Sequence, residues 1–352
     1  MNYLWTKDPV VLRSTDKYQM WKKLLLNPWM AVVTLAIIVS VRIWDPSFVE
    51  SVRLRYFDQL ITGQPRSETP ISVVNIDEAA LDHFGQWPFP RAMYGDLLQE
   101  LHRRNAGVIV FNVLTPESDR FNQDRAYASV LRRVQTVLPE MGSMKNKNQA
   151  RTPNTMKVGE NAEGRVVEYL GILANVPEVE LAAAGAGMAN TFPEIDGVVR
   201  RMPLVILSNS ELYPALALEA LRVASGDNRI QVKIGAAGVE ALRIPKLGKL
   251  QTDSLSRIWI DWSQTAKQYS MMELPDDFQG GIVVVGLSAA GLINPIATAR
   301  GEVWPQDLQA AVMGTVLAGT NITRPDSSDS YETVALAVLG LLVIFFGVWR
   351  RR

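Results

Sequence analysis

Two apolar stretches, one near each end of the chain, constrain the fold more than any other feature of the sequence. The first covers residues 24–44 and the second covers residues 331–349. A membrane-spanning helix needs about 20 apolar residues, because it rises about 1.5 Å per residue across roughly 30 Å of hydrocarbon. The sequence therefore predicts one transmembrane helix at each end, with a buried core helix as the alternative for the second stretch.

Basic residues flank both apolar stretches on their outer sides. The segment 1–23 contains five of them, and the tail 350–352 consists of three arginines. Lys and Arg are enriched in the cytoplasmic flanks of spanning helices. We therefore expect both termini to be cytoplasmic and the body, residues 45–330, to lie across the membrane from them. A cleaved signal peptide fits less well, because the first stretch starts late and no Ala-x-Ala site follows it.

The chain has no cysteine and only two histidines, His83 and His102. The lack of cysteine excludes disulfides, iron–sulfur centres and thiolate zinc sites, and two histidines are too few for a histidine-rich metal site. Basic residues do not cluster with aromatic ones on one predicted face, which argues against nucleic-acid binding. We therefore predict no metal, no cofactor and no nucleic-acid partner.

Short runs of β-branched residues alternate with amphipathic helical patterns through the body. We predict strands at 71–76, 108–113, 135–138 and 282–286, and helices at 91–104, 122–133, 214–224 and 306–318. These strands are largely apolar and do not alternate strictly with polar residues, which is typical of parallel strands buried on both faces. The pattern predicts an α/β fold with a mixed, largely parallel sheet flanked by helices. Residues 143–165 contain few large apolar side chains, and we predict a loop excursion there.

Three segments, spread over nearly the whole body, resemble one known family. They are VRLRYFDQLITGQPRSETPISVVNIDEAALDHFGQWPFPRAMYGDLLQEL followed by GVIVFNVL, GMANTFPEIDGVVRRMPLVI with YPALALEAL, and GGIVVVGLSAAGLINPIATARGEVWPQDLQAAVMGTVLAGTNITRP. In order and spacing they resemble the CHASE2 domain, an extracytoplasmic sensory module of bacterial transmembrane receptors. The resemblance implies a periplasmic α/β sensor anchored in the inner membrane. In this family the sensor usually precedes several spans and a cytoplasmic cyclase, kinase or diguanylate-cyclase output.

The chain departs from the family pattern in its residues and in its architecture. Asn112 stands where the family strand typically ends in an aspartate, and Gln309 stands where the last helix commonly carries a histidine. We expect one span instead of several after the body and no output domain after Arg352. These departures favour a non-catalytic structural or accessory subunit of a bacterial envelope assembly, which contacts the membrane and other envelope proteins or a second copy of itself. The alternative is a periplasmic ligand-sensing receptor module that signals through a separate cytoplasmic output protein.

Six residues are candidate ligand contacts. They are Asp77, Glu78, Trp87, Arg91, Asn112 and Arg200. The first five follow predicted parallel strands, and ligands of open α/β sheets bind at the carboxyl ends of the strands. Arg200, beside the turn formed by Asp196 and Gly197, suits a bidentate anion clamp. The sequence does not identify the ligand.

Plainer roles compete with ligand binding at these positions. Asp77 or Glu78 can cap the following helix and pair with Arg91, and we favour that interpretation over a calcium or magnesium site. Trp87 then belongs to a packed aromatic lid. The turn GLSAAG at 286–291 lacks the G-x-S-x-G pattern and no histidine follows it, which argues against a nucleophile elbow and against an enzyme.

Overall fold

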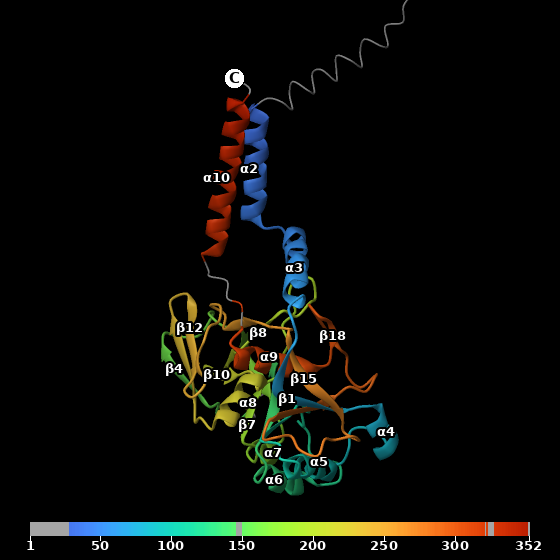
Figure 1. Ribbon diagram of the computed structural model, residues 1–352. Helices are drawn as coiled ribbons and strands as arrows, with labels where there is room; N and C mark the ends of the chain where they lie inside the picture. Colours follow the sequence, from blue (N-terminus) through green and yellow to red (C-terminus); the bar gives the residue numbers. More distant parts are fainter. Residues whose placement is uncertain (1–27, 146–149, 321, 323–326, 351–352) are drawn as a thin grey trace, which may run out of the picture. The chain divides into compact units, whose positions relative to one another are not determined.

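The computed structural model describes residues 28–145, 150–320, 322 and 327–350 (Figure 1). The chain divides into two units. One unit comprises residues up to Arg53 and from Pro325 onward, and the other comprises Leu54–Arg324. Helix α3 (Ser47–Thr62) runs across the boundary between the units. The first unit therefore holds the apolar stretches and the second holds the body.

The first unit contains two apolar helices, α2 (Pro28–Trp44) and α10 (Ser328–Trp349). Helix α10 is long and apolar enough to cross a membrane, and none of its described side chains is buried in the protein. Helix α2 has 17 described residues and meets the same standard only as part of a bent pair with α3. The structure thus provides the C-terminal apolar helix that we predicted. The N-terminal span, whose residues 24–27 lie outside the described part, stays a prediction.

Helices α2 and α10 pack side by side within this unit (Figure 1). Gly340 of α10 lies directly against Leu35 of α2, where an added Cβ would collide with the leucine side chain. Arg42 of α2 pairs with two carboxylates at the start of α10, Asp329 at 2.6 Å and Glu332 at 2.8 Å. Close backbone approach and an ion pair at one end together fix the helix pairing.

The second unit is built on a parallel sheet. Its strands run in the order β15-β1-β16-β2-β3-β7, and β6 pairs antiparallel with the end of β3. Their bounds are β1 (Ser67–Ile76), β2 (Val108–Phe111), β3 (Thr136–Ser143), β6 (Gly171–Leu173), β7 (Gly185–Met188), β15 (Gln264–Ser270) and β16 (Ile282–Leu287). This arrangement confirms the predicted α/β fold with a largely parallel sheet.

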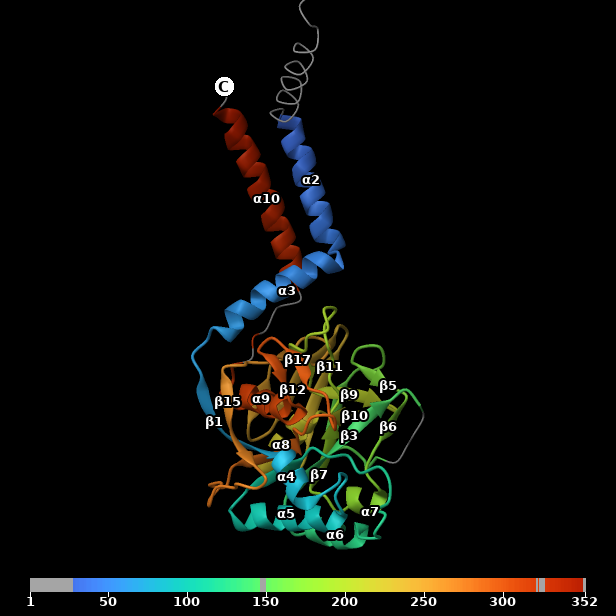
Figure 2. The ribbon, with the colours of Figure 1, turned by 90° about the vertical axis from the view of Figure 1, so that its right-hand side faces the viewer.

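Helices cover both faces of the sheet, which explains why its inner strands β2 and β16 are apolar (Figure 2). One face packs against α4 (Glu78–Phe84), α5 (Arg91–Arg103), α6 (Asp124–Leu131) and α7 (Pro177–Glu180), and the other against α8 (Leu216–Ser225) and α9 (Pro305–Ala318). On β1, Val74 is buried in the cluster of the first face and Val73 in that of the second. Successive residues of one strand are thus buried on opposite faces.

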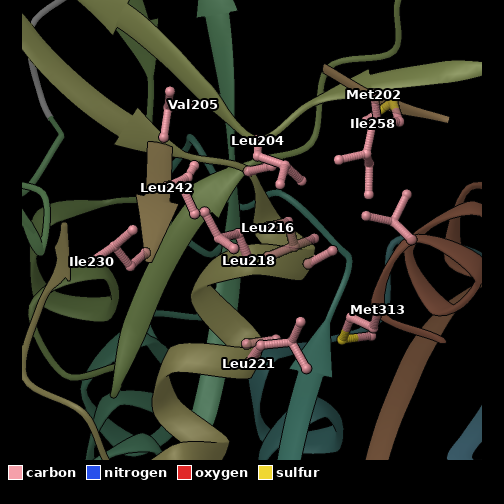
Figure 3. Packing of buried hydrophobic residues seen from close by; sticks show 14 of the residues in the cluster. Met202, Leu204, Val205, Leu216, Leu218, Leu221, Ile230, Leu242, Ile258 and Met313 are labelled. Atoms are coloured by element: carbon pink, nitrogen blue, oxygen red, sulfur yellow. The ribbon is translucent and has the colours of Figure 1, made fainter. Parts of the chain in front are cut away.

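The larger core cluster is centred on α8. Leu216, Leu218 and Leu221 of this helix are at most 1% exposed and pack near Met313 of α9 (Figure 3). Each fully buried leucine contributes about 1.5–3 kcal/mol relative to an exposed one. The helix ends at Gly226, whose φ of +66° is a left-handed conformation that favours glycine. Helix α8 is therefore a fixed element of the body.

Smaller sheets complete the second unit. They are formed by β4 (Thr155–Gly159), β5 (Glu168–Tyr169), β8 (Arg201–Pro203), β9 (Val205–Ser208), β10 (Glu211–Pro214), β11 (Ile230–Gly235), β12 (Gly238–Ile244), β13 (Gly248–Leu250), β14 (Arg257–Trp259), β17 (Ile296–Thr298) and β18 (Gly301–Val303). The predicted loop excursion 143–165 therefore contains a strand, β4, which pairs in parallel with β11. Most side chains of β4 are exposed, so its sequence carries few apolar residues and no strand signal.

Candidate functional site

Asp77 and Glu78, predicted at the end of a strand, make hydrogen bonds within the protein. Asp77 caps α4, because its Oδ1 accepts a hydrogen bond from Ala80 N at 3.1 Å. Glu78 Oε1 accepts from Ala290 N at 2.8 Å and so joins the loop after β1 to the loop after β16. The capping interpretation is confirmed for Asp77.

Arg91 does not pair with Asp77 or Glu78, and that part of our prediction is wrong. Its Nε donates to Asp124 Oδ1 at 3.4 Å and its Nη2 donates to Glu117 O at 3.1 Å. The arginine is 9% exposed and its guanidinium lies 5.5 Å from the ring centre of Tyr94. Arg91 therefore ties the start of α5 to the loop that follows β2.

An aromatic group closes this corner of the sheet. The ring of Trp87 lies 5.2 Å from Phe89 and 5.7 Å from Tyr94, which in turn contacts Phe111 at the end of β2. Asn112 N donates to Val285 O at 2.8 Å and extends the pairing of β2 with β16. The rings pack as a lid over the strand ends, and ligand binding by the residues of this corner stays a prediction.

Arg200 lies apart from the other five residues and is completely buried. Its guanidinium donates four hydrogen bonds of 2.7–2.8 Å, two to Asp58 of α3 and two to Asp196. Burial alone would lower the pKa of Arg200, but the hydrogen bonds to both aspartates outweigh burial and raise it. The same hydrogen bonding lowers the pKa of Asp196. The predicted anion clamp thus holds two carboxylates of the chain itself.

Asp58 makes this cluster a connection between the body and α3. The preceding residue of α3, Phe57, packs edge to face on Trp259 of β14, with ring centres 4.8 Å apart. Arg201 covers Trp259 at 5.0 Å and forms a bidentate pair with Glu194 at 2.6 and 2.7 Å. We name Asp58, Arg200, Asp196, Phe57 and Trp259 the α3 clamp. It holds the second half of α3 by a buried charge cluster and an aromatic contact.

A cavity of about 560 Å³ borders the α3 clamp. Its walls include Phe57, Leu60 and Ile61 of α3, and Trp259, Ile260 and Asp261 of the body, with Thr320 at its margin. This volume lies within the range of small-molecule sites, and the wall combines apolar side chains with polar ones such as Gln64, Ser263 and Gln264. The cavity therefore touches both the segment that enters the body and the segment that leaves it.

Asp261 is the charged group of the cavity wall. Burial alone would raise the pKa of this carboxyl, but hydrogen bonds from Ser263, Thr320 and Gln264 outweigh burial and lower it. Asp261 is therefore anionic at neutral pH. It links the cavity to Thr320, whose hydroxyl donates to Asp261 Oδ2 at 2.5 Å just after the end of α9.

Sequence reasoning missed Asp58, Trp259 and Asp261. Asp58 occurs in a helical pattern with several other charged residues, and nothing local marks it as the partner of Arg200, 142 positions later. Gln309, the departure from the family histidine, is 1% exposed and its Oε1 accepts from Ala217 N at 3.2 Å. At this position the amide joins α9 to α8.

The fold belongs to the class of α/β proteins, and it is joined to one apolar helix that is long enough to cross a membrane. The family model described as the CHASE2 domain matches residues 32–348, nearly the whole chain. The chain therefore belongs to the CHASE2 domain family, as its three segments had indicated. Neither the curated proteins nor the solved structures give a match.

The family assignment bears on the two functions that the sequence left open. CHASE2 domains are extracytoplasmic sensory domains, so the body is an extracytoplasmic domain of the sensory type. This finding favours the receptor alternative over the structural or accessory subunit, which neither the family match nor the structure supports. The orientation of the termini and the inner-membrane location stay predictions.

Proposed function

We propose that this chain is a non-catalytic receptor module, in which the extracytoplasmic body binds a ligand and passes the resulting change through α3 to the membrane helices. A separate cytoplasmic protein then provides the output. The observation that carries the proposal is the α3 clamp, in which completely buried Arg200 grips Asp58 of α3 with two hydrogen bonds of 2.7 Å. The body thereby controls the helix that connects it to the first apolar stretch.

Helix α3 is suited to transmission because it is continuous from Ser47 to Thr62. It begins three positions after α2 ends at Trp44, so little chain is available to absorb a movement between them. A clamp that moves Asp58 therefore displaces the whole helix rather than one turn of it. A ligand can shift such an equilibrium only by the difference in its affinity for the two states.

The cavity beside the α3 clamp is the place where we expect the ligand to act. Its apolar wall and its anionic Asp261 suit a small, largely apolar molecule that carries a hydrogen-bond donor. Such a molecule would contact Phe57 and Leu60 of α3 on one side and Ile260 on the other. Occupancy would thus favour one position of α3 over another.

A thermal-shift screen of the full chain in lipid nanodiscs tests the proposal. Small apolar amines and alcohols are screened against the unmodified chain and against Leu60→Trp, which fills the cavity from an exposed position of α3. Tyr56→Trp is the matched control, since Tyr56 lies one turn earlier, is exposed, and does not line the cavity. A ligand at about 100 times its Kd stabilises by about 2.7 kcal/mol, which raises Tm by roughly 5–10 °C.

The expected result is at least one compound that raises the Tm of the unmodified chain and of Tyr56→Trp but not that of Leu60→Trp. A compound that shifts all three proteins equally would bind elsewhere and remove the cavity from the proposal. A screen without any shift in the unmodified chain would count against a ligand-sensing function.

A further inference from the structure

Two buried carboxyl groups, one on β3 and one on α7, lie together outside the α3 clamp. Glu140 comes from β3 and Glu180 from the last position of α7, and they are 0% and 1% exposed. Asn175 brings them together, because its Nδ2 donates to Glu180 Oε2 at 2.7 Å and to Pro139 O, in the residue before Glu140, at 3.0 Å. Two acidic residues that are buried together and in contact are a costly arrangement, which calls for a specific explanation.

The hydrogen bonds around the pair leave one donor missing. Glu180 Oε2 accepts from Asn175 Nδ2 at 2.7 Å and from Asn175 N at 3.3 Å. Neither oxygen of Glu140, nor Oε1 of Glu180, has a hydrogen-bond donor among the described residues. Two carboxylates in contact have only acceptors to offer each other, whereas a carboxylic acid donates to a carboxylate. A proton on one of the two groups supplies the missing donor.

Three titratable side chains on neighbouring elements also face the two carboxyl groups. Arg151 is the nearest positive group and acts on both carboxyls, but its Nη1 is held by Ala183 O at 2.9 Å. Glu219 of α8 adds negative charge, and its own partner is Arg222 at 2.6 Å. Tyr213 of β10 stays neutral, because burial raises the pKa of its phenol to about 12. The surroundings therefore do not neutralise a second carboxylate.

Burial and the neighbouring Glu180 raise the pKa of Glu140 to about 9, and burial also raises the pKa of Glu180. The first value describes the pair, since strongly interacting groups titrate together. At neutral pH the pair therefore holds at least one proton. At alkaline pH the proton is lost, and two negative charges are left in contact in a buried site.

We propose that Glu140 and Glu180 form a proton-binding site, and that loss of the shared proton at alkaline pH moves α7 away from β3. Through this site the extracytoplasmic domain would respond to pH. The response does not depend on ligand binding in the cavity beside the α3 clamp. The ligand is the proton itself.

Helix α7 is the element that we expect to move, because it has only four residues, Pro177–Glu180. Its attachment runs through Asn175, whose Nδ2 also donates to Pro139 O at 3.0 Å and whose Oδ1 accepts from Thr115. Val176 N donates to Thr115 O at 2.9 Å. A movement of α7 therefore reaches the loop after β2, which begins with the predicted ligand residue Asn112 and contacts Arg91 through Glu117 O.

Infrared spectroscopy of the full chain in nanodiscs tests for the proton directly. The unmodified chain is expected to show the C=O stretch of a buried carboxylic acid, which disappears with a midpoint near the pKa of the pair, about 9. Glu140→Gln and Glu180→Gln are each expected to abolish this titrating band, because the amide then donates to the remaining carboxylate. Glu211→Gln, at an exposed position of β10, is the control and is expected to keep it.

The movement of α7 has its own measurement. The chain contains no cysteine, so a Leu181→Cys variant carries one environment-sensitive fluorophore at an exposed position beside α7. Its emission is expected to change with the same midpoint as the infrared band, and to be constant when Glu140→Gln is added. Absence of a titrating band in the unmodified chain overturns the proton site, whether or not the variants fold. Constant emission across the titration overturns the movement of α7.

Discussion

Replacing Arg200 by alanine is the sharpest perturbation of the α3 clamp. Arg200→Ala removes a completely buried guanidinium together with four hydrogen bonds of 2.7–2.8 Å. It leaves behind two carboxylates, whose side chains are 16% exposed for Asp58 and 5% exposed for Asp196. Both groups are then negatively charged, close together and largely shielded from water.

The magnitude follows from this burial. Removing one partner of a buried ion pair costs about 3–5 kcal/mol, because the remaining charge is left uncompensated. The exposure of Asp58 allows partial rehydration, which places the expected loss at about 3–4 kcal/mol. Asp58→Asn removes one of the two ion pairs but keeps an acceptor oxygen, so we expect about half that loss. For a body of this size, 1 kcal/mol corresponds to roughly 2–4 °C in Tm.

Thermal unfolding of the full chain in nanodiscs, followed by circular dichroism, is the assay. We expect a Tm lower by about 6–16 °C for Arg200→Ala. Lys233→Ala is the matched control, because its ion pair with Glu240 is exposed, with side chains 61% and 48% accessible. An exposed pair of this kind contributes at most about 1 kcal/mol. Equal Tm values for Arg200→Ala and Lys233→Ala would refute the clamp as an energetic connection between the body and α3.

Three further predictions concern separate parts of the body. The folded state holds the proton of Glu140 up to pH about 9, whereas an unfolded glutamate loses it near the ordinary pKa of 4.5, so stability falls as pH rises between these values. Glu140→Gln should therefore flatten the decline of Tm from pH 6 to 9, and an unchanged slope would contradict the shared proton. Asp77→Ala removes the cap of α4 and should cost about 1 kcal/mol in chemical denaturation, with no loss if the hydrogen bond to Ala80 is unimportant. Gly107→Ala would place a Cβ 2.2 Å from Gly280 O, and we expect low yields of folded protein, whereas normal expression would show that this turn can shift.

Strands with strong local signals were predictable from the sequence. The apolar runs of β1 and β16 are buried on both faces, so their composition alone indicates parallel strands. Strand β15 was missed because its residues, QTAKQYS, are polar and only partly buried. It is a strand because β1, about 200 positions earlier, provides its hydrogen-bonding partners. Long-range pairing of this kind leaves no local pattern.

In the candidate site, too, local contacts were predictable from the sequence and long-range contacts were not. The cap at Asp77 depends on residues three positions apart and was predicted as the favoured interpretation. The partner of Arg91 was not, because Asp124 is brought into place by the folding of the loop after β2. The clamp of Arg200 on Asp58 joins residues 142 positions apart. The arginine could be selected from its turn context, but its partner could not.

The mobility of α3 is the measurement that tests the central claim most directly. A spin label is attached in a Tyr56→Cys variant of the full chain, at an exposed position of α3 two residues from Asp58. The account predicts that adding Asp58→Asn increases the mobility of this label, as seen by electron paramagnetic resonance in nanodiscs, whereas adding Lys233→Ala leaves it unchanged. Identical mobility in all three proteins would contradict the claim that the body holds and directs α3.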